Sequence, residues 1–143
     1  RLNGNYSFQY CRNVVIRNAE IHSKDAFWNT KDVTVYDSVV DGEYLGWHSR
    51  NLRLVNCRIS GTQALCYAEN LVLENCTLGE DADLCFEYSS VHAEIKGRVH
   101  SVKNPRSGRI VAEEYGDIIL DEHCKAPANC SIETGKKQSG EAA

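Results

Sequence analysis

The sequence predicts an all-β solenoid, a single-stranded parallel β-helix. The first observation is that similar residues recur every 19 positions, without insertion, over residues 2–96. The second is that each repeat holds short alternating segments separated by Asn, Asp and Gly, and that no ten-residue stretch has the 3.6-residue period of a helix. Repeats of this length bury their apolar side only by stacking on one another, so we expect regular coils about 4.8 Å apart.

Four apolar columns recur at the 19-residue period and are the candidates for the interior of the solenoid. Their members are Leu2, Ile21, Val40, Ile59 and Leu78; Val14, Val33, Leu52 and Leu71; Ile16, Val35, Leu54 and Leu73; and Phe8, Phe27, Leu65 and Leu84, with Gly46 as a gap. The segments at 51–54 and 70–73 alternate apolar and other residues, which is typical of a strand with one buried face. We therefore expect Leu54 and Leu73 to stack between coils and to be fully buried.

Two polar columns flank each of these strands and predict turns. They are Asn13, Asp32, Asn51 and Asn70, and Asn18, Asp37, Asn56 and Asn75. Short polar side chains tolerate the left-handed conformation, and stacked Asn side chains can hydrogen-bond along the solenoid axis. Gly42, Gly61 and Gly79 mark another corner of the coil.

The pattern divides the chain into three parts. Residues 1–96 hold five regular coils (2–20, 21–39, 40–58, 59–77 and 78–96), with the register lost near Ser89 and Ser90. Residues 97–133 contain both prolines, Pro105 and Pro127, and are expected to form irregular coils that cap the C-terminal end. Residues 134–143 are expected to be a disordered tail. A leucine-rich repeat is the alternative fold, but the leading Leu of its consensus would fall at Ser49 and Ala68.

The repeat is already in phase at Leu2, and the chain begins at Arg1 and contains no Met. From this we expect coils upstream of residue 1, or self-association at the open first coil. The net charge of −4 argues against a nucleic-acid partner, because phosphate binding needs a positive surface. No apolar run is long enough to cross a membrane.

A series of short motifs resembles a known family. In order, they are Lys24-Asp25-Ala26-Phe27-Trp28-Asn29, Gly42-Glu43-Tyr44-Leu45-Gly46-Trp47, Leu65-Cys66-Tyr67, Phe86-Glu87-Tyr88-Ser89 and Ser101-Val102-Lys103-Asn104-Pro105. They resemble an uncharacterised bacterial family of unknown function in the pectin-lyase-like group. The resemblance covers most of residues 4–120, implies a right-handed β-helix, and implies no activity. The aspartate and basic sets of pectin-type lyases and hydrolases have no match in this sequence.

The seven cysteines are expected to be free thiols, which is typical of a reducing, cytoplasmic compartment. Cys57 and Cys76 share one column, and Cys66 and Cys85 share another. His123, Cys124 and Cys130 are a weak candidate metal set; we expect neither a metal site nor a cofactor.

Two functional classes remain open. One is a non-catalytic scaffold or interaction solenoid, and the other is a carbohydrate-binding or carbohydrate-active β-helix. If Phe27 and Leu65 point inward, alternation sends the column of Gln9, Trp28, Trp47, Cys66 and Cys85 outward. The opposite arrangement, with the Trp column inward, also stays open.

The candidate site of the carbohydrate hypothesis gathers around this column. The candidate binding residues are Trp28, Trp47, His48, Lys24, Asp25, Tyr44, Asp83 and Glu87. Glu43 and Asp81 lie two coils apart and are weak candidates for an acid and base, since glycosidic cleavage uses carboxyls about 5–10 Å apart.

Overall fold

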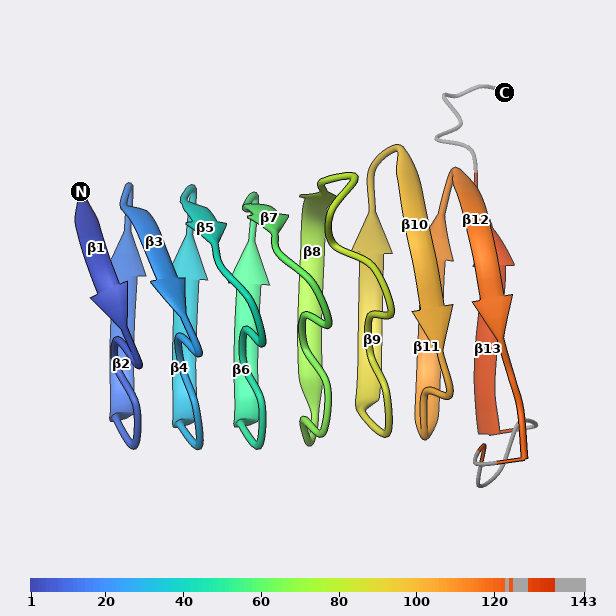
Figure 1. Ribbon diagram of the computed structural model, residues 1–143, viewed down its shortest axis with the longest axis horizontal. Coiled ribbons are helices and arrows are strands. Elements are labelled where there is room, and N and C mark those ends of the chain that lie inside the picture. The colour runs from blue at the N-terminus through green and yellow to red at the C-terminus, as the bar shows by residue number, and fades with distance from the viewer. Residues whose placement is uncertain (123, 125–128, 136–143) are drawn as a thin grey trace.

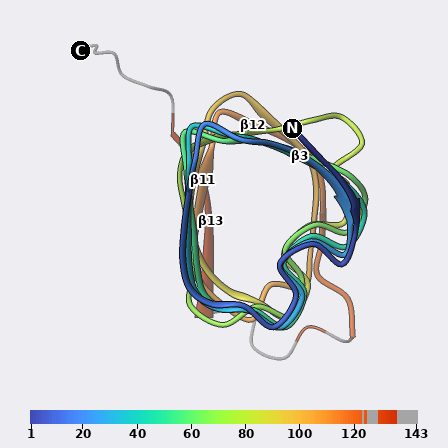
Figure 2. The same cartoon turned by 90° about the vertical axis from the view of Figure 1, so that its left-hand side faces the viewer.

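The computed structural model describes residues 1–122, 124 and 129–135, and in this part of the chain the fold is a right-handed parallel β-helix. Figure 1 shows the strands standing side by side along one axis, from β1 at one end to β13 at the other. Seen down that axis, the coils superpose around a closed core (Figure 2). The predicted fold class is confirmed.

One face of the solenoid is a long parallel sheet. Its strands are β2 (Arg12–Arg17), β4 (Lys31–Tyr36), β6 (Arg50–Val55), β8 (Leu71–Leu78), β9 (Ser90–Ile95), β11 (Ser107–Ala112) and β13 (Cys130–Thr134). A second row of parallel strands, joined to the first through β8, consists of β1 (Leu2–Asn5), β3 (Glu20–Lys24), β5 (Val39–Asp41) and β7 (Arg58–Ser60). The last pair is β10 (Arg98–Lys103) and β12 (Glu114–Ile119).

The strand register reproduces the 19-residue period of the sequence. Val35 pairs with Leu54, and Leu54 pairs with Leu73, so one apolar column runs through three coils. These three side chains are at most 1% exposed. The inward direction of this column is therefore confirmed, and burial of such columns is the main source of the stability of the fold.

The Asn and Asp columns combine a backbone role with a side-chain role. Asn51 and Asn56 have φ of +56° and +55°, and their column neighbours take the same left-handed conformation. Asn51 Nδ2 donates to Asp32 Oδ1 at 2.7 Å, and Asn70 Nδ2 donates to Asn51 Oδ1 at 2.7 Å. The second column repeats this, with Asn75 Nδ2 donating to Asn56 Oδ1 at 2.6 Å. Both predicted roles, turn former and ladder, are confirmed.

The fourth apolar column differs from the prediction at its last member. The amide of Gln63 donates to Asp83 O, whereas the amide of Tyr44 donates to Thr62 O, so two extra residues enter the turn after Gly79. Leu84 therefore takes the place of Gln63 and is half-buried. Phe86, which is 0% exposed, follows Phe27 and Leu65 in the core instead.

Beyond residue 96 the chain forms further coils of changed length. His92 pairs with Arg109, and Arg109 pairs with Ser131, at spacings of 17 and 22 residues in place of 19. Asn104 is 0% exposed and exchanges hydrogen bonds with Asp121, which fixes the end of the segment that follows β12. His123, Pro127 and residues 136–143 of the expected tail lie outside the described residues.

The first coil is the least covered part of the described core. Leu2, Phe8, Val14 and Ile16 pack against the core but stay partly exposed, whereas Ile21 and Phe27, one coil further on, are at most 1% exposed. Nothing in the described structure stacks on the open side of this coil. In the described part of the chain, no helix has the length and hydropathy to cross a membrane.

Candidate functional site

Seven rings form a continuous aromatic strip along one side of the solenoid. We name it from its members, Tyr6, Trp28, Tyr44, Trp47, His48, Tyr67 and Tyr88. Trp28 and Trp47 are nearly parallel, with centroids 6.0 Å apart. Trp47 continues to Tyr67 at 4.8 Å, and Tyr67 to Tyr88 at 5.7 Å. The strip therefore spans the coils from the first to the fifth.

The backbone places these rings because left-handed residues alternate with extended ones at this corner. Phe27 (φ +61°) turns into the core and is 0% exposed, while the next residue, Trp28, is half-buried at the surface. Of the two arrangements that the sequence leaves open, the structure therefore has the one with Phe27 and Leu65 inward. Figure 2 shows the coils bending inward on the side that follows the end of β3.

The expected outward direction is wrong for two members of the column that contains Trp28 and Trp47. Cys66 and Cys85 are both 0% exposed. Cys66 is buried although it follows Trp47 in register, because its small thiol fits between coils and contacts Gln63 O and Leu84 O. Cys85 leaves the column because of the two-residue insertion. Glu87 takes its place, since Glu87 O accepts from an amide of the preceding coil, as Trp28 O and Trp47 O do.

The acidic residues expected at the rim have different surroundings. Asp25 is 4% exposed, and burial raises its pKa, to which the Glu43 charge adds and which the Lys24 charge opposes. Lys24 Nζ lies 5.8 Å from the centre of the Tyr44 ring. Glu87 forms an ion pair with Lys103 at 3.6 Å and has a side chain 14% exposed.

The remaining acids support the turn of the fifth coil. Asp81 Oδ1 accepts from the Gly61 amide at 3.3 Å, and Asp83 Oδ1 accepts from the Thr62 hydroxyl. The bond to Asp81 takes the place of the backbone bond that the Gly42 amide makes to Ser60 O one coil earlier. Both carboxylates therefore have a structural use, separate from the aromatic strip.

A cavity of about 280 Å³ opens beside the strip, and we call it the strip cavity. It is lined by Asn29, His48, Ser49, Arg50, Tyr67 and Glu69. His48 stacks on Tyr67 at 5.3 Å with an interplanar angle of 19°, and Arg50 Nε lies 3.4 Å from Glu69 Oε1. Burial raises the pKa of Tyr67, so its hydroxyl stays a donor at neutral pH. The lining of this cavity thus combines two aromatic rings with an amide, a cation and an anion.

All seven cysteines are free thiols in the structure. Cys57 and Cys76 are stacked in one column, and both are buried. Burial raises the pKa of Cys66 to about 12 and also raises the pKa of Cys85, so neither side chain supplies a thiolate at neutral pH. Buried cysteines act here as small core side chains.

His22 is held between two carboxylates on the outer side of β3. Its Nε2 lies 2.9 Å from Glu20 Oε2 and its Nδ1 lies 3.1 Å from Asp41 Oδ2. These hydrogen bonds, first to Glu20 and then to Asp41, raise the pKa of His22, and the bond to His22 lowers the pKa of Glu20. The pKa of Asp41 is lowered first by the hydrogen bond from the Ser60 hydroxyl and then by the one to His22. Within the described ranges, no three His, Cys, Asp or Glu side chains are placed to hold a metal ion.

We expect this arrangement to make stability depend on pH. Because the pKa of His22 is raised in the folded state, its protonated form stabilises the fold. This stabilisation is complete below the unfolded pKa of about 6.5 and is lost as the pH rises through the folded pKa. Nuclear magnetic resonance titration should place the His22 pKa above the ordinary range. Asp41→Asn should bring it back toward that range, and an unchanged His22 pKa in this variant would contradict the assignment.

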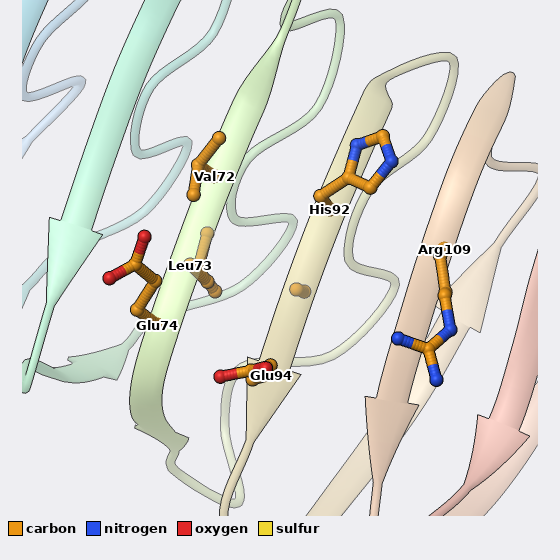
Figure 3. A pocket seen from close by; sticks show the side chains of 7 residues that line it. Val72, Leu73, Glu74, His92, Glu94 and Arg109 are labelled. Carbon is orange, nitrogen blue, oxygen red and sulfur yellow. The ribbon is translucent and has the colours of Figure 1, made fainter.

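A second hollow, the sheet cavity, was not expected from the sequence. It has a volume of about 430 Å³ and lies on the outer face of β8, β9 and β11 (Figure 3). Its lining residues are Val72, Leu73, Glu74, His92, Ala93, Glu94 and Arg109. The residues at outward positions of β8, β9 and β11 could have indicated this cavity. Aligning them, however, requires the strand register across the break near Ser89.

Comparison with known proteins identifies a family and no close relative. No curated protein and no solved structure matches the chain. One family model, described as "Protein of unknown function (DUF3737)", matches residues 1–133. Since this match covers most of the chain, the protein belongs to that family of unknown function, DUF3737.

Proposed function

We propose that this protein is a non-catalytic solenoid that binds carbohydrate in the strip cavity. The observation that carries the proposal is that the stacked rings of His48 and Tyr67 line one cavity together with Asn29, Arg50 and Glu69. A sugar ring needs this combination, because its C–H face packs on an aromatic ring while its hydroxyls require donors and acceptors. Arg50 and Glu69 are 65% and 55% exposed in their side chains, so a ligand can reach both.

The length of the aromatic strip favours a glycan chain over a single sugar. From the strip cavity, the rings of Trp28 and Trp47 continue toward the first coil and that of Tyr88 toward the last regular one. One coil advances by about 4.8 Å, a step similar to that of one unit of an extended glycan. We therefore propose that the chain lies along the solenoid axis, with one unit in the strip cavity.

A scaffold without a glycan ligand is the second candidate, and one observation favours it. Trp28 and Trp47 stack on each other, and Trp47 Nε1 donates to Gln63 O at 2.7 Å. Rings that cover each other's faces link neighbouring coils and leave mostly edges for a ligand. His48 and Tyr67 are stacked as well, but Asn29, Arg50 and Glu69 line the same cavity, so the proposal rests on the strip cavity and gives the Trp pair a supporting role.

Tryptophan fluorescence tests the proposal directly, because the only two Trp residues of the chain both belong to the aromatic strip. A glycan array should identify a ligand, and titration with that oligosaccharide should shift the emission through the contact of Trp28 with His48 at 5.1 Å. We expect Tyr67→Ala and Arg50→Ala to weaken binding at least tenfold, the loss of roughly 1.4 kcal/mol.

Two matched variants control for general effects of substitution. Tyr36→Ala removes a half-buried tyrosine from the outer face of β4, and Arg58→Ala removes an exposed arginine from β7. Both should bind as the unchanged protein does. If no glycan binds, or if Tyr67→Ala binds as tightly as Tyr36→Ala, the carbohydrate proposal is wrong and the scaffold remains.

A further inference from the structure

The outer face of the long sheet carries two parallel rows of side chains around the sheet cavity. The first row follows the strand register through Arg53, Val72, His92 and Arg109. The second row lies two residues further along each strand, at Glu74, Glu94, Val111 and Glu133. Residues two apart on a strand project from the same face, so both rows point to solvent.

The rows are joined by diagonal ion pairs at both ends. Arg53 on β6 donates through Nε and Nη2 to Glu74 on β8, at 3.1 and 2.9 Å. Arg109 on β11 donates in the same way to Glu133 on β13, at 2.9 Å for each bond. In both pairs the acid lies on the next strand, two residues beyond the register partner of the base. Such bidentate pairs fix both partners.

Between these two ion pairs, the diagonal pairing of a base with an acid on the next strand is missing at two places. By the same diagonal, the acid for His92 would stand at position 111, and the base for Glu94 would stand at position 72. Both positions are Val. Within the described residues, the structure records no hydrogen bond or ion pair for the side chain of His92 or Glu94, although the charge of Glu94 acts on Arg109. Figure 3 shows the two side chains on β9, between Glu74 and Arg109.

We propose that the sheet cavity binds a free α-amino acid with an apolar side chain. The ammonium group of the ligand would pair with Glu94, and its carboxylate would accept a hydrogen bond from the His92 imidazole. Each charge of the zwitterion thus replaces the partner that Val72 or Val111 does not supply. The apolar side chain of the ligand would pack on Val72, which is half-buried and lines the cavity.

The requirement for both charges follows from what is already paired. The guanidinium groups of Arg53 and Arg109 are held by carboxylates, so His92 is the donor open to an anion, and a simple anion bound there would leave Glu94 without a partner. A simple cation would neutralise Glu94 and leave the imidazole without a partner. Because the site is open to water, we expect weak binding, with a Kd of about 1 mM.

L-Leucine is the test ligand. Its titration should shift the ring signals of His92 in a saturable way and should give saturation transfer to the leucine methyl groups. Two analogues each keep one charge: leucinamide keeps the ammonium, and 4-methylpentanoate keeps the carboxylate. Both should bind at least tenfold more weakly than L-leucine. Equal binding of either analogue would exclude the zwitterion proposal.

Two kinds of substitution test the assignment: some remove a group that would bind the ligand, and one adds the acid that the sheet lacks. Glu94→Gln and His92→Gln should each weaken the saturation transfer to leucine at least tenfold, while Glu80→Gln and His100→Gln, both outside the cavity, should not. Val111→Glu supplies the acid that His92 lacks and should abolish leucine binding while the fold is kept. Absence of a saturable response to L-leucine, or unchanged binding by Glu94→Gln, would overturn the proposal. Because the strip cavity is elsewhere, Glu94→Gln should leave glycan binding unchanged.

Discussion

Leu73→Ala is expected to lower the free energy of unfolding by about 2–5 kcal/mol, and Leu54→Ala by a similar amount. Both side chains are at most 1% exposed and are register partners in neighbouring strands. The truncation removes apolar contacts with the coils on both sides, and the closed ring of each coil leaves little room for the backbone to fill the cavity. Urea unfolding followed by circular dichroism measures the loss.

The location of the loss is as informative as its size. Each coil of a solenoid contacts only its neighbours, so hydrogen exchange should accelerate most in β6, β8 and β9 and least in β1. Because Leu54 and Leu73 touch, the double variant should not equal the sum of the single ones. Leu120→Ala, at a side chain 48% exposed, is the matched control and should have little effect. Costs below about 1 kcal/mol at both buried sites would contradict the assignment of this column.

The regular coils were predictable because one physical requirement repeats in them. Stacking requires every inward position to be apolar, so Val33 is followed by Leu52 one coil later. It also requires a residue that accepts the left-handed conformation at every sharp corner, where Asn51 lies. This periodicity is local in sequence and needs no knowledge of distant contacts. The same argument gave Phe27 and Trp28 opposite directions but left open which of the two points inward, and the structure places Phe27 in the core.

The sequence pattern was insufficient where a coil changes length. Two residues inserted after Gly79 move Phe86 into the column where the constant period predicts Leu84. The large side chain of Phe86 also takes φ of +71°, a conformation that its residue type disfavours. Only the hydrogen bonds to the preceding coil fix this register, and they cannot be derived from a residue's own type.

The site could be predicted in part for the same reason. The period correctly placed Trp28 and Trp47 together, but the sequence marks Asp25 as a polar turn residue, whereas the structure buries it. The break between Val72 and Glu94 is invisible without the register, since their separation of 22 residues is not the repeat length. Sites made by regular stacking are therefore easier to find than those made by its interruption.

Gly61→Ala is expected to destabilise the protein by at least about 3 kcal/mol, although it adds a single methyl group. Gly61 has φ of +112°, and a Cβ atom there would lie 2.2 Å from Gly42 O. That oxygen belongs to the backbone of the preceding coil, so it cannot rotate away as a side chain would. The clash would separate coils that the core columns hold together.

Gly97→Ala separates this clash from backbone strain. Gly97 also has a positive φ, +80°, but nothing lies within 4 Å of the place where its Cβ would be. Its substitution should therefore cost only the left-handed conformation of an L-residue, about 1–2 kcal/mol. Thermal unfolding of the two variants measures the difference, and failure of Gly61→Ala to fold beside a folded Gly97→Ala would agree with it. Equal stabilities would mean that the coils at this corner can move apart, and that Gly42 and Gly61 are not required for their close approach.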